Sequence, residues 1–365
     1  MTNSACRAIL NIVDIIILLL LSNTFINYFS DSTTVKKSIC FLGPYKIMIK
    51  ISEVVKVMLT SSDIEKRLIN NDALFNNIYV VHQNFDILPC TTQHFGTSID
   101  YQDLLELRDD FLNELYDTIV DWVFSSPRYV KLKEAALRKG KSESAASSEI
   151  QRKAQEKFRG DRNSDKLLVQ GQFGELLLFH YIQRFQKAVP LLRKMPIKTS
   201  SQHERFGADA IHFKIENDKP IIILGEAKTY TSKYKFSQAF EDAITSILST
   251  YSSHRKELYS YLHEDFLDDE MNDIAEKYIN NTLDNFEVRL VCLVVYNETE
   301  QKCCTSQNDI RKQITEIIEK RFRDFDNNKI DIANNPILNR ITYIIMPIWK
   351  LEELASEFQN KIYKI

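Results

Sequence analysis

The sequence predicts an α/β protein in which helices flank a mixed β-sheet, with a smaller α+β module nearer the N-terminus. Apolar runs of strand length recur along the second half of the chain, and amphipathic helical patterns separate them. The 365 residues are enough for one large domain or two ordinary ones. A hydrophobic content of 44%, a charged content of 27% and a net charge of −3 are typical of globular chains. Any nucleic-acid-binding surface must therefore be local.

The first segment, residues 1–47, is an apolar N-terminal extension. Its run over Ala8–Leu21 is broken by Asn11 and Asp14 and is too short to span a bilayer, which takes roughly 20 residues. Three interpretations stay open: a non-native stretch translated from an early start codon, a membrane anchor or signal segment, and a buried helix. We prefer the first, with the native protein beginning near Met48, and expect a cytoplasmic protein without stable membrane association.

The sequence pattern over residues 48–127 predicts the α+β module. β-branched and aromatic residues over Tyr45–Leu59 and Asn77–Leu88 favour strands. Apolar spacing over Asp100–Phe124 predicts one long amphipathic helix that begins at the aspartate. The module contains no catalytic cluster, and its histidines are interpreted as structural or surface residues.

Residues 128–166 predict a basic connector, with twelve Lys or Arg against six Asp or Glu. Arg138, Lys139 and Lys141 cluster around Gly140. One interpretation is a solvated linker. The other is an arm that contacts phosphates, because sequence-independent binding needs little more than clustered cations. The three cations are therefore candidate substrate-binding residues.

Residues 167–365 predict the main sheet and its helices. The expected strands are Ala208–Ile215, Pro220–Lys228, Val288–Tyr296 and Ile341–Ile348. One expected helix contains Glu175, and the others cover Lys235–Tyr251, Ile310–Phe322 and Lys350–Ile362. The acidic run Glu264–Glu276 is interpreted as a solvated helical face rather than a second metal cluster. The six cysteines show no CxxC spacing, which argues against zinc and indicates a reducing compartment.

Two of these strands bring acidic residues together. The polar pair Asn217-Asp218 suits the centre of a hairpin turn, and this register places Asp209 opposite Glu226. Directly opposed like charges are destabilising. A divalent cation between the two carboxylates would turn this repulsion into coordination. Alternation along the strand puts Lys228 on the same face as Glu226.

A third acidic residue lies on the preceding helix. Glu175 sits among apolar residues on nearly every side, and burying an unpaired charge is costly. The chain has eight glycines, and four of them lie near these acidic residues, where glycine permits close backbone approach. These four are Gly171, Gly174, Gly207 and Gly225. The pattern favours a site over a surface ion pair.

The constellation resembles the PD-(D/E)xK superfamily of restriction-endonuclease-like nucleases. Glu175 matches the acid of the first helix, Asp209 the motif aspartate, and Glu226 and Lys228 the acid and lysine of the second motif. The surrounding Gly-Gln-Phe-Gly-Glu, Gly-Ala-Asp-Ala and Gly-Glu-Ala-Lys further resemble the HamA family, the nuclease subunits of Hachiman-type anti-phage defence. The resemblance covers roughly residues 167–348. Ala208 stands where the superfamily motif has proline.

This resemblance implies a restriction-endonuclease-like fold and a DNA nuclease that depends on Mg²⁺ or Mn²⁺. Asp209, Glu226 and the carbonyl of Ala227 would bind the metal, and Glu175 would support a ligand or hold a second ion. The metal would stabilise phosphate charge and activate a water. Lys228 would orient that water or stabilise developing negative charge.

The resemblance also implies further contacts and a partner. Gln238, on the helix after the lysine strand, is a weak candidate for a substrate contact. In the family the nuclease works with a helicase, and this chain lacks a GxxxxGK[ST] phosphate loop of its own. Residues 48–127 are therefore predicted to dock that helicase and to restrain cleavage. The alternative is a non-catalytic nucleic-acid-binding or partner-binding subunit that retains a nuclease-like fold.

Overall fold

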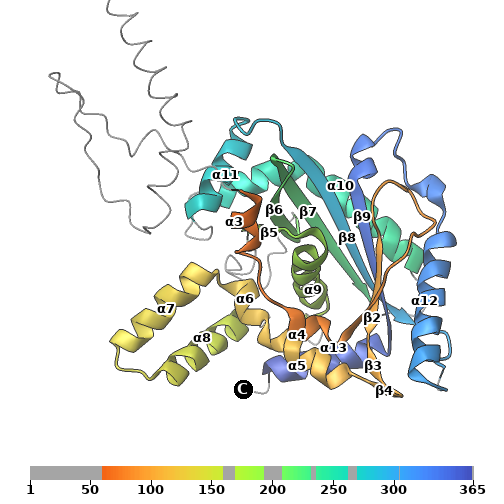
Figure 1. Cartoon of the computed structure of the whole chain (residues 1–365), viewed down its shortest axis with the longest axis horizontal. Helices are drawn as coiled ribbons and strands as arrows, with labels where there is room; N and C mark the ends of the chain where they lie inside the picture. The colour runs from red at the N-terminus through yellow and green to blue at the C-terminus, as the bar shows by residue number, and fades with distance from the viewer. Residues whose placement is uncertain are drawn as a thin grey trace, which may run out of the picture. The chain divides into compact units, whose positions relative to one another are not determined.

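In the computed structural model, seven strands form one mixed sheet in the order β1-β2-β9-β8-β7-β6-β5 (Figure 1). The strands are β1 (Ile78–Val81), β2 (Phe95–Ile99), β5 (Val189–Leu192), β6 (Ala210–Glu216), β7 (Lys219–Tyr230), β8 (Glu287–Glu298) and β9 (Ile341–Trp349). Strands β7, β8, β9 and β2 are parallel, whereas β1, β6 and β5 pair antiparallel with their neighbours. Helices flank this sheet, as the sequence predicts.

The structure describes residues 60–158, 169–192, 208–231, 236–261, 269–303 and 305–363. The apolar segment 1–47 and the strand expected over Tyr45–Leu59 lie outside these residues. None of the helices that can be described is both long and apolar enough to cross a membrane.

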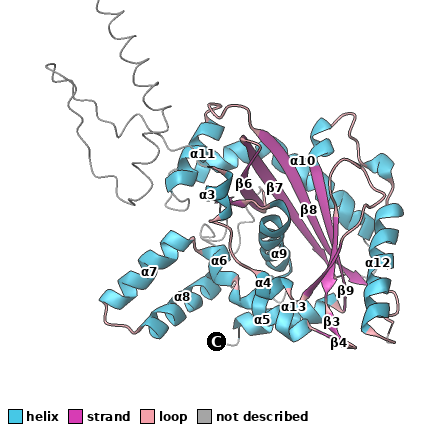
Figure 2. Cartoon of the chain, in the orientation of Figure 1, coloured by secondary structure: helices cyan, strands magenta, loops and turns pink. Residues whose placement is uncertain are grey.

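Two helical layers enclose the sheet (Figure 2). One layer contains α5 (Arg108–Asp117), α6 (Ile119–Val123), α9 (Val169–Gln186) and α13 (Leu351–Tyr363), whose apolar residues share a core with Ile223, Leu293 and Ile344. The other contains α10 (Phe236–Tyr261) and α12 (Gln307–Arg323), where Phe240 packs on Tyr343 with ring centroids 4.6 Å apart. The remaining helices are α3 (Ser61–Glu65), α4 (Asp72–Phe75), α7 (Ser126–Arg138), α8 (Glu143–Phe158) and α11 (Asp269–Ile279).

The hairpin that joins β6 to β7 has the predicted register. Asn217 and Asp218 have φ angles of 51° and 58°, the left-handed conformation that a two-residue hairpin turn of this type requires. Ile211 pairs with Leu224, and Ala210 pairs with Gly225. The turn chemistry alone therefore identified the cross-strand partners correctly.

Strands β1 and β2 join the same sheet as the catalytic candidates. Phe95 of β2 pairs with Ile344 of β9, and all five β2 residues are buried. His94, directly before β2, also links this strand to β9, because its Nδ1 accepts a hydrogen bond of 3.1 Å from the Tyr343 amide. Thr60–Ile365 form one compact unit, and strands β1 and β2 belong to the same sheet as β7.

The long helix expected over Asp100–Phe124 is wrong at its start and its middle. Asp100 instead binds the Arg311 guanidinium, and residues Tyr101–Gln102 and Leu105–Glu106 form the small hairpin β3-β4 around Asp103, whose φ is 55°. Helix α5 begins only at Arg108, and Thr118 separates it from α6. The prediction failed because Leu104 and Leu105 fit the helical spacing of apolar residues, whereas in the structure both are exposed on the hairpin.

The described part of the basic connector folds as a helical hairpin, α7-α8, that projects from the rest of the unit (Figure 1). Gly140, with a φ of 82°, lies in the turn between the two helices. Ala136 of α7 and Ile150 of α8 are buried, and Lys133 forms a 2.5 Å ion pair with Glu143. Residues 159–168 lie outside the described part.

Candidate active site

Asp209 lies immediately before β6, beside the carboxyl-terminal half of β7. Its backbone N–H donates to the Gly225 carbonyl at 3.0 Å, and its Oδ2 accepts a hydrogen bond of 2.9 Å from the Ala227 amide. At the start of β6, the Asp209 carboxylate thus accepts the hydrogen bond from the β7 backbone that a main-chain carbonyl would otherwise accept. Asp209 is held next to the Glu226-Ala227-Lys228 stretch, as the predicted register requires.

Glu226 is buried, with 4% of its surface exposed, and its carboxylate is surrounded by donors. Oε1 accepts hydrogen bonds from Lys228 Nζ at 2.9 Å and from Ser246 Oγ at 2.6 Å. Thr250 Oγ1 lies 3.5 Å from Oε2. Ser246 and Thr250 belong to α10, so this helix orients the carboxylate from above the strand.

Lys228 is a stabilised cation. Burial lowers the pKa of its ammonium group, but the charge and hydrogen bond of Glu226, together with the charge of Asp209, outweigh burial and hold that pKa above its ordinary value. The group is therefore protonated near neutral pH. It can attract a phosphate or orient a water, but it is unsuited to act as a general base.

A polar stripe continues from these residues along the interface between β7 and α10. Tyr230 donates a short hydrogen bond to Asp242, which also accepts one of 2.7 Å from Gln238. Burial, followed by the Asp242 contact, raises the pKa of Tyr230 to about 12. Gln238 thus lies at the outer end of the stripe, on the same helix as Ser246. No contact joins Gln238 directly to Glu226 among the hydrogen bonds of the described residues.

Ser246 and Thr250 were not among the residues predicted from the sequence. The available signal was their spacing of four residues, which continues the series Gln238, Asp242 and places all four side chains on one helix face. The predicted polar face instead contained Thr245, which is exposed. An error of one residue in the predicted helical phase is enough to place Thr245 on the polar face instead of Ser246.

Glu175 lies on α9, which packs on the other face of β7. Adjacent Gly174 faces Ala227 and Thr229, whereas Glu226 and Lys228 point toward α10. Glu175 Oε2 and Thr229 Oγ1 are both buried and have no hydrogen-bond partner among the described residues. Two orphaned oxygen atoms on this side of the strand would gain from a cation or water.

The close packing of α9 on β7 yields a stability prediction. A Cβ added at Gly174 would lie 2.5 Å from Thr229 Oγ1, whereas one added at Gly171 would meet nothing within 4 Å. Gly174→Ala should therefore destabilise the fold by about 1–3 kcal/mol through overpacking. Gly171→Ala on the same helix should be neutral or stabilising by up to about 1 kcal/mol. Urea unfolding of both variants measures the difference.

Thr229→Ala added to Gly174→Ala supplies the control. Removing the hydroxyl removes the clash, so the double variant should recover most of the lost stability. Equal unfolding midpoints for Gly174→Ala and Gly171→Ala would contradict the close approach of α9 to β7.

The donor set near the site is small. Among the residues that the structure describes, no three His, Cys, Asp or Glu side chains gather closely enough to hold a metal ion. Cys292 of β8 pairs with Glu226, but burial raises the pKa of its thiol, which keeps it protonated. The part of the acidic run that is described, residues 269–276, belongs to α11. A cation here would have two protein carboxylates, from Asp209 and Glu226, and would need further oxygen ligands.

The three basic candidate residues lie on the α7-α8 hairpin. The candidate catalytic residues Asp209, Glu226 and Lys228 lie elsewhere, on or next to strands β6 and β7. Lys141 forms an ion pair of 2.5 Å with Glu149, and Arg138 lies 4.0 Å from Glu134. Lys139 follows the end of α7 and is exposed. The hairpin presents these cations to solvent.

Comparison with known proteins extends the sequence resemblance. The profile of one protein family, described as HamA, matches residues 73–362. The match covers most of the chain and begins well before Leu167, so it includes strands β1 and β2. No curated protein matches the sequence.

Proposed function

The chain belongs to the HamA family, and on that premise we propose that it is the nuclease subunit of a Hachiman-type anti-phage defence system. The proposed activity is metal-dependent hydrolysis of DNA phosphodiesters. The observation that supports it is the convergence of Asp209, Glu226 and Lys228 beside one strand: Asp209 binds the Ala227 amide, and Glu226 binds the Lys228 ammonium.

The residues present fit Mg²⁺ or Mn²⁺. Asp209, Glu226 and the Ala227 carbonyl would hold the ion. Mg²⁺ is usually bound by one or two carboxylates, with water and substrate phosphate at the remaining positions, and a site with two carboxylates matches this habit. The buried, unpartnered Oε2 of Glu175 would support a ligand or a second ion. When bound, the metal would neutralise phosphate charge and lower the pKa of a water.

The side chains of the protein would contribute position and charge. Lys228, held protonated by Glu226 and Asp209, would stabilise negative charge that develops on the phosphate. Ser246 binds Glu226 at 2.6 Å and lies 3.3 Å from Lys228 Nζ, so it would fix the relative position of the two groups. Neither role requires a histidine or a nucleophilic cysteine.

Incubation of the purified protein with linear, circular and single-stranded DNA tests the proposal directly. Cleavage with Mg²⁺ or Mn²⁺ that EDTA abolishes is the expected result. Binding without cleavage of any of the three substrates would favour the alternative, a non-catalytic nucleic-acid-binding or partner-binding subunit. Ordered hydrogen bonding around Glu226 and Lys228 favours the enzyme.

The α7-α8 hairpin is proposed to contact the DNA backbone. Replacing Arg138, Lys139 and Lys141 together by glutamine should weaken DNA binding. For every phosphate that the variant no longer neutralises, the slope of log K against log salt should also fall in magnitude by about 0.9. The measurement is fluorescence anisotropy with a labelled duplex at several salt concentrations.

A matched control changes the net charge equally. Lys312, Arg323 and Lys350 are exposed cations outside the hairpin, with side chains 60–75% exposed. Their triple glutamine variant should keep the wild-type salt slope. Equal slopes for the two triple variants would remove the hairpin from the DNA interface.

We propose that the region of residues 48–127 docks a helicase partner, because the chain lacks a phosphate loop of its own. Deleting this region is a poor test, since β2 pairs with β9 inside the sheet. Co-purification with the product of the neighbouring gene is the direct assay. Point substitutions on the surface of the region are the appropriate variants.

A further inference from the structure

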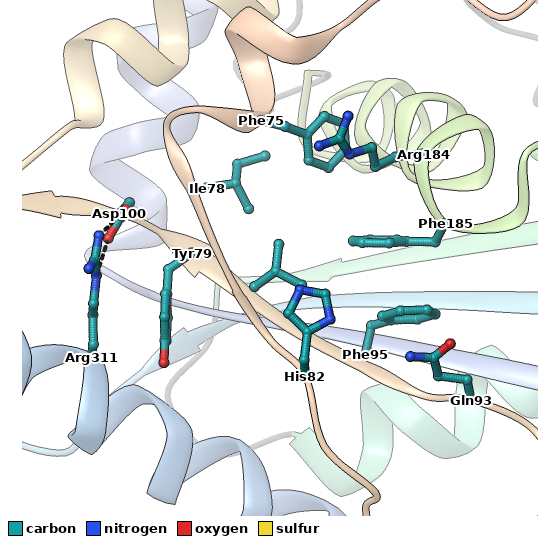
Figure 3. A pocket seen from close by; sticks show the side chains of 11 residues that line it. Phe75, Ile78, Tyr79, His82, Gln93, Phe95, Asp100, Arg184, Phe185 and Arg311 are labelled. Carbon is teal, nitrogen blue, oxygen red and sulfur yellow. Dashed lines mark hydrogen bonds and ion pairs between the residues drawn. The ribbon is translucent and has the colours of Figure 1, made fainter.

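A groove follows the outer edge of β1, the strand at one margin of the sheet (Figure 3). Its cavity volume is about 550 Å³. Aromatic side chains form much of its lining, and two arginines stand among them. The principal lining residues are Phe75, Tyr79, Phe95, Arg184, Phe185 and Arg311.

The groove reaches both faces of the sheet around this edge. Ile78 and Val80 pack with the core under α9, where Phe95 and Phe185 stack with ring centroids 4.2 Å apart. Tyr79, between them in sequence, points to the opposite face, and its hydroxyl lies 3.2 Å from that of Thr315 on α12. A chain running along β1 would therefore meet aromatic side chains on both faces of the sheet.

The edge itself is open to another strand. In the described part of the chain, no strand pairs with the outer side of β1. Strand β5, at the other margin, contains Pro190 and a register shift between Pro190 and Leu192. Proline and bulges protect edge strands from pairing with other chains. The β1 sequence Ile-Tyr-Val-Val has neither device.

The direction of the backbone groups follows from the β1-β2 register. The Asp100 amide donates to the Asn77 carbonyl at 2.9 Å, so this pair is hydrogen-bonded. Hydrogen-bonded and non-hydrogen-bonded pairs alternate in antiparallel strands. Tyr79 therefore bonds inward to Ser98, whereas the N–H and C=O groups of Ile78 and Val80 face outward. Two residues offer their backbone groups to an incoming strand.

The lining of the groove contains two arginines and one aspartate, whereas Asp72, the 63% exposed partner of Arg184, lies outside the lining. The side chains of Arg184 and Arg311 are 41% and 33% exposed, whereas that of Asp100 is 14% exposed. Each arginine binds one aspartate of the chain, Asp72 and Asp100 respectively. A guanidinium has five N–H donors, so one carboxylate leaves others for a further acceptor. An acidic occupant is complementary to this rim.

From the open edge, the aromatic lining and the exposed cations, we propose that β1 binds an extended acidic segment of a partner protein by strand addition. Apolar side chains of the segment fill the α9 side of the groove, and its carboxylates meet Arg184 and Arg311. The identity of the partner as a protein rests on the helicase-docking role proposed above for residues 48–127. The inference is independent of nuclease activity.

A nucleotide fits the same groove less well. A base could stack on the aromatic rings, and its phosphate could use the same spare N–H donors of Arg184 and Arg311. A base, however, leaves the outward N–H groups of Ile78 and Val80 unused. Backbone pairing therefore distinguishes a peptide from a nucleic acid.

Selection from a random dodecapeptide library on the immobilised full-length protein tests the proposal, with binding of the enriched peptides then measured by fluorescence polarisation. Peptides with alternating apolar residues and several acidic ones are expected. Val80→Pro should weaken their binding about tenfold, since it removes an outward N–H without touching the hydrogen bonds to β2. Val80→Ala, which keeps that N–H, should retain most of the affinity.

Several results would overturn the proposal. These are the absence of any enriched peptide, enrichment of basic peptides, and equal affinity for the two Val80 variants. Displacement of the peptides by oligothymidylate would assign the groove to nucleic acid, and a dimer that Val80→Pro dissociates would assign the edge to a second copy. Thermal melting verifies the fold. If Val80→Pro does not fold, Arg184→Gln should weaken acidic-peptide binding severalfold, and unchanged binding would refute the charge argument.

DNA cleavage measured on the same variants separates this inference from the proposed enzyme activity. Val80→Pro should cleave as the wild type does, because β1 lies at the margin of the sheet, with three strands between it and β7. A wild-type protein that binds the peptides but cuts no DNA would refute the enzyme proposal and leave the docking edge intact.

Discussion

Glu226→Gln and Lys228→Ala are each expected to reduce DNA cleavage by at least about 10²–10³-fold. The glutamine has the shape of the glutamate but lacks the charge that would hold a cation and that keeps Lys228 protonated. Alanine at Lys228 removes the ammonium group itself. Single-turnover cleavage of a labelled duplex with Mg²⁺ measures both effects without interference from product release.

Loss of folding must be separated from loss of chemistry in these variants. Glu226→Gln leaves a half-buried ammonium without its anion, which is costly because burial already disfavours the charged form. The double variant Glu226→Gln/Lys228→Met removes both charges and should therefore melt closer to the wild type than Glu226→Gln alone. It should remain inactive.

Matched surface variants complete the comparison. Glu353→Gln and Lys312→Ala change the same residue types at positions that are 59% and 75% exposed. Both should cleave at the wild-type rate. Full activity in either Glu226→Gln or Lys228→Ala would exclude these residues from the reaction, whatever the controls show.

The hairpin at the centre of the site was predictable because its information is local. Asn217-Asp218 specifies a two-residue turn, and a turn of fixed length fixes every cross-strand pair that follows. The proximity of Asp209 to Glu226 and Lys228 was a consequence of that register. The catalytic roles of these residues remain predictions, which the cleavage assays test.

Other features depended on contacts between residues distant in sequence. Strand β2 reads Phe-Gly-Thr-Ser-Ile and has no strong strand pattern, yet it is buried because it pairs with β9 almost 250 residues away. A Cβ at Gly96 would lie 2.5 Å from Ile318 Cγ2, so α12 selects glycine there. Neither constraint can be read from a short window of sequence.

Lowering the pH from 7.5 to 5 is expected to destabilise the fold by about 4 kcal/mol through two buried histidines. Burial lowers the pKa of His94 to about 4 and that of His180 to about 3. A basic group whose pKa is depressed by folding favours the native state only while it is neutral. Stability is therefore complete above the unfolded pKa of about 6.5 and is lost as the pH falls below it.

The hydrogen bonds of His94 explain why its neutral form is required. Its Nε2 donates to the Pro89 carbonyl at 3.1 Å, and its Nδ1 accepts from the Tyr343 amide at 3.1 Å. A second proton would occupy Nδ1 and face that amide, with no acceptor in place. His180 Nδ1 likewise lies 3.2 Å from the Asn71 side-chain amide. Each ring should therefore contribute about 2 kcal/mol of the loss at pH 5.

The pH window separates the histidines from the paired carboxylates. Glu216 and Glu287 have pKa values lowered to about 2, so their contribution is retained until the pH falls below about 4.5. Urea unfolding between pH 7.5 and 5 thus reports mainly on the histidines. His94→Gln and His180→Gln should each remove about 2 kcal/mol of the dependence, although both lower stability at pH 7.5. Burial also lowers the pKa of His254, so this third ring contributes to the dependence that remains. The exposed His82→Gln should leave the curve unchanged, and an unaltered slope in both buried-histidine variants would refute the assignment.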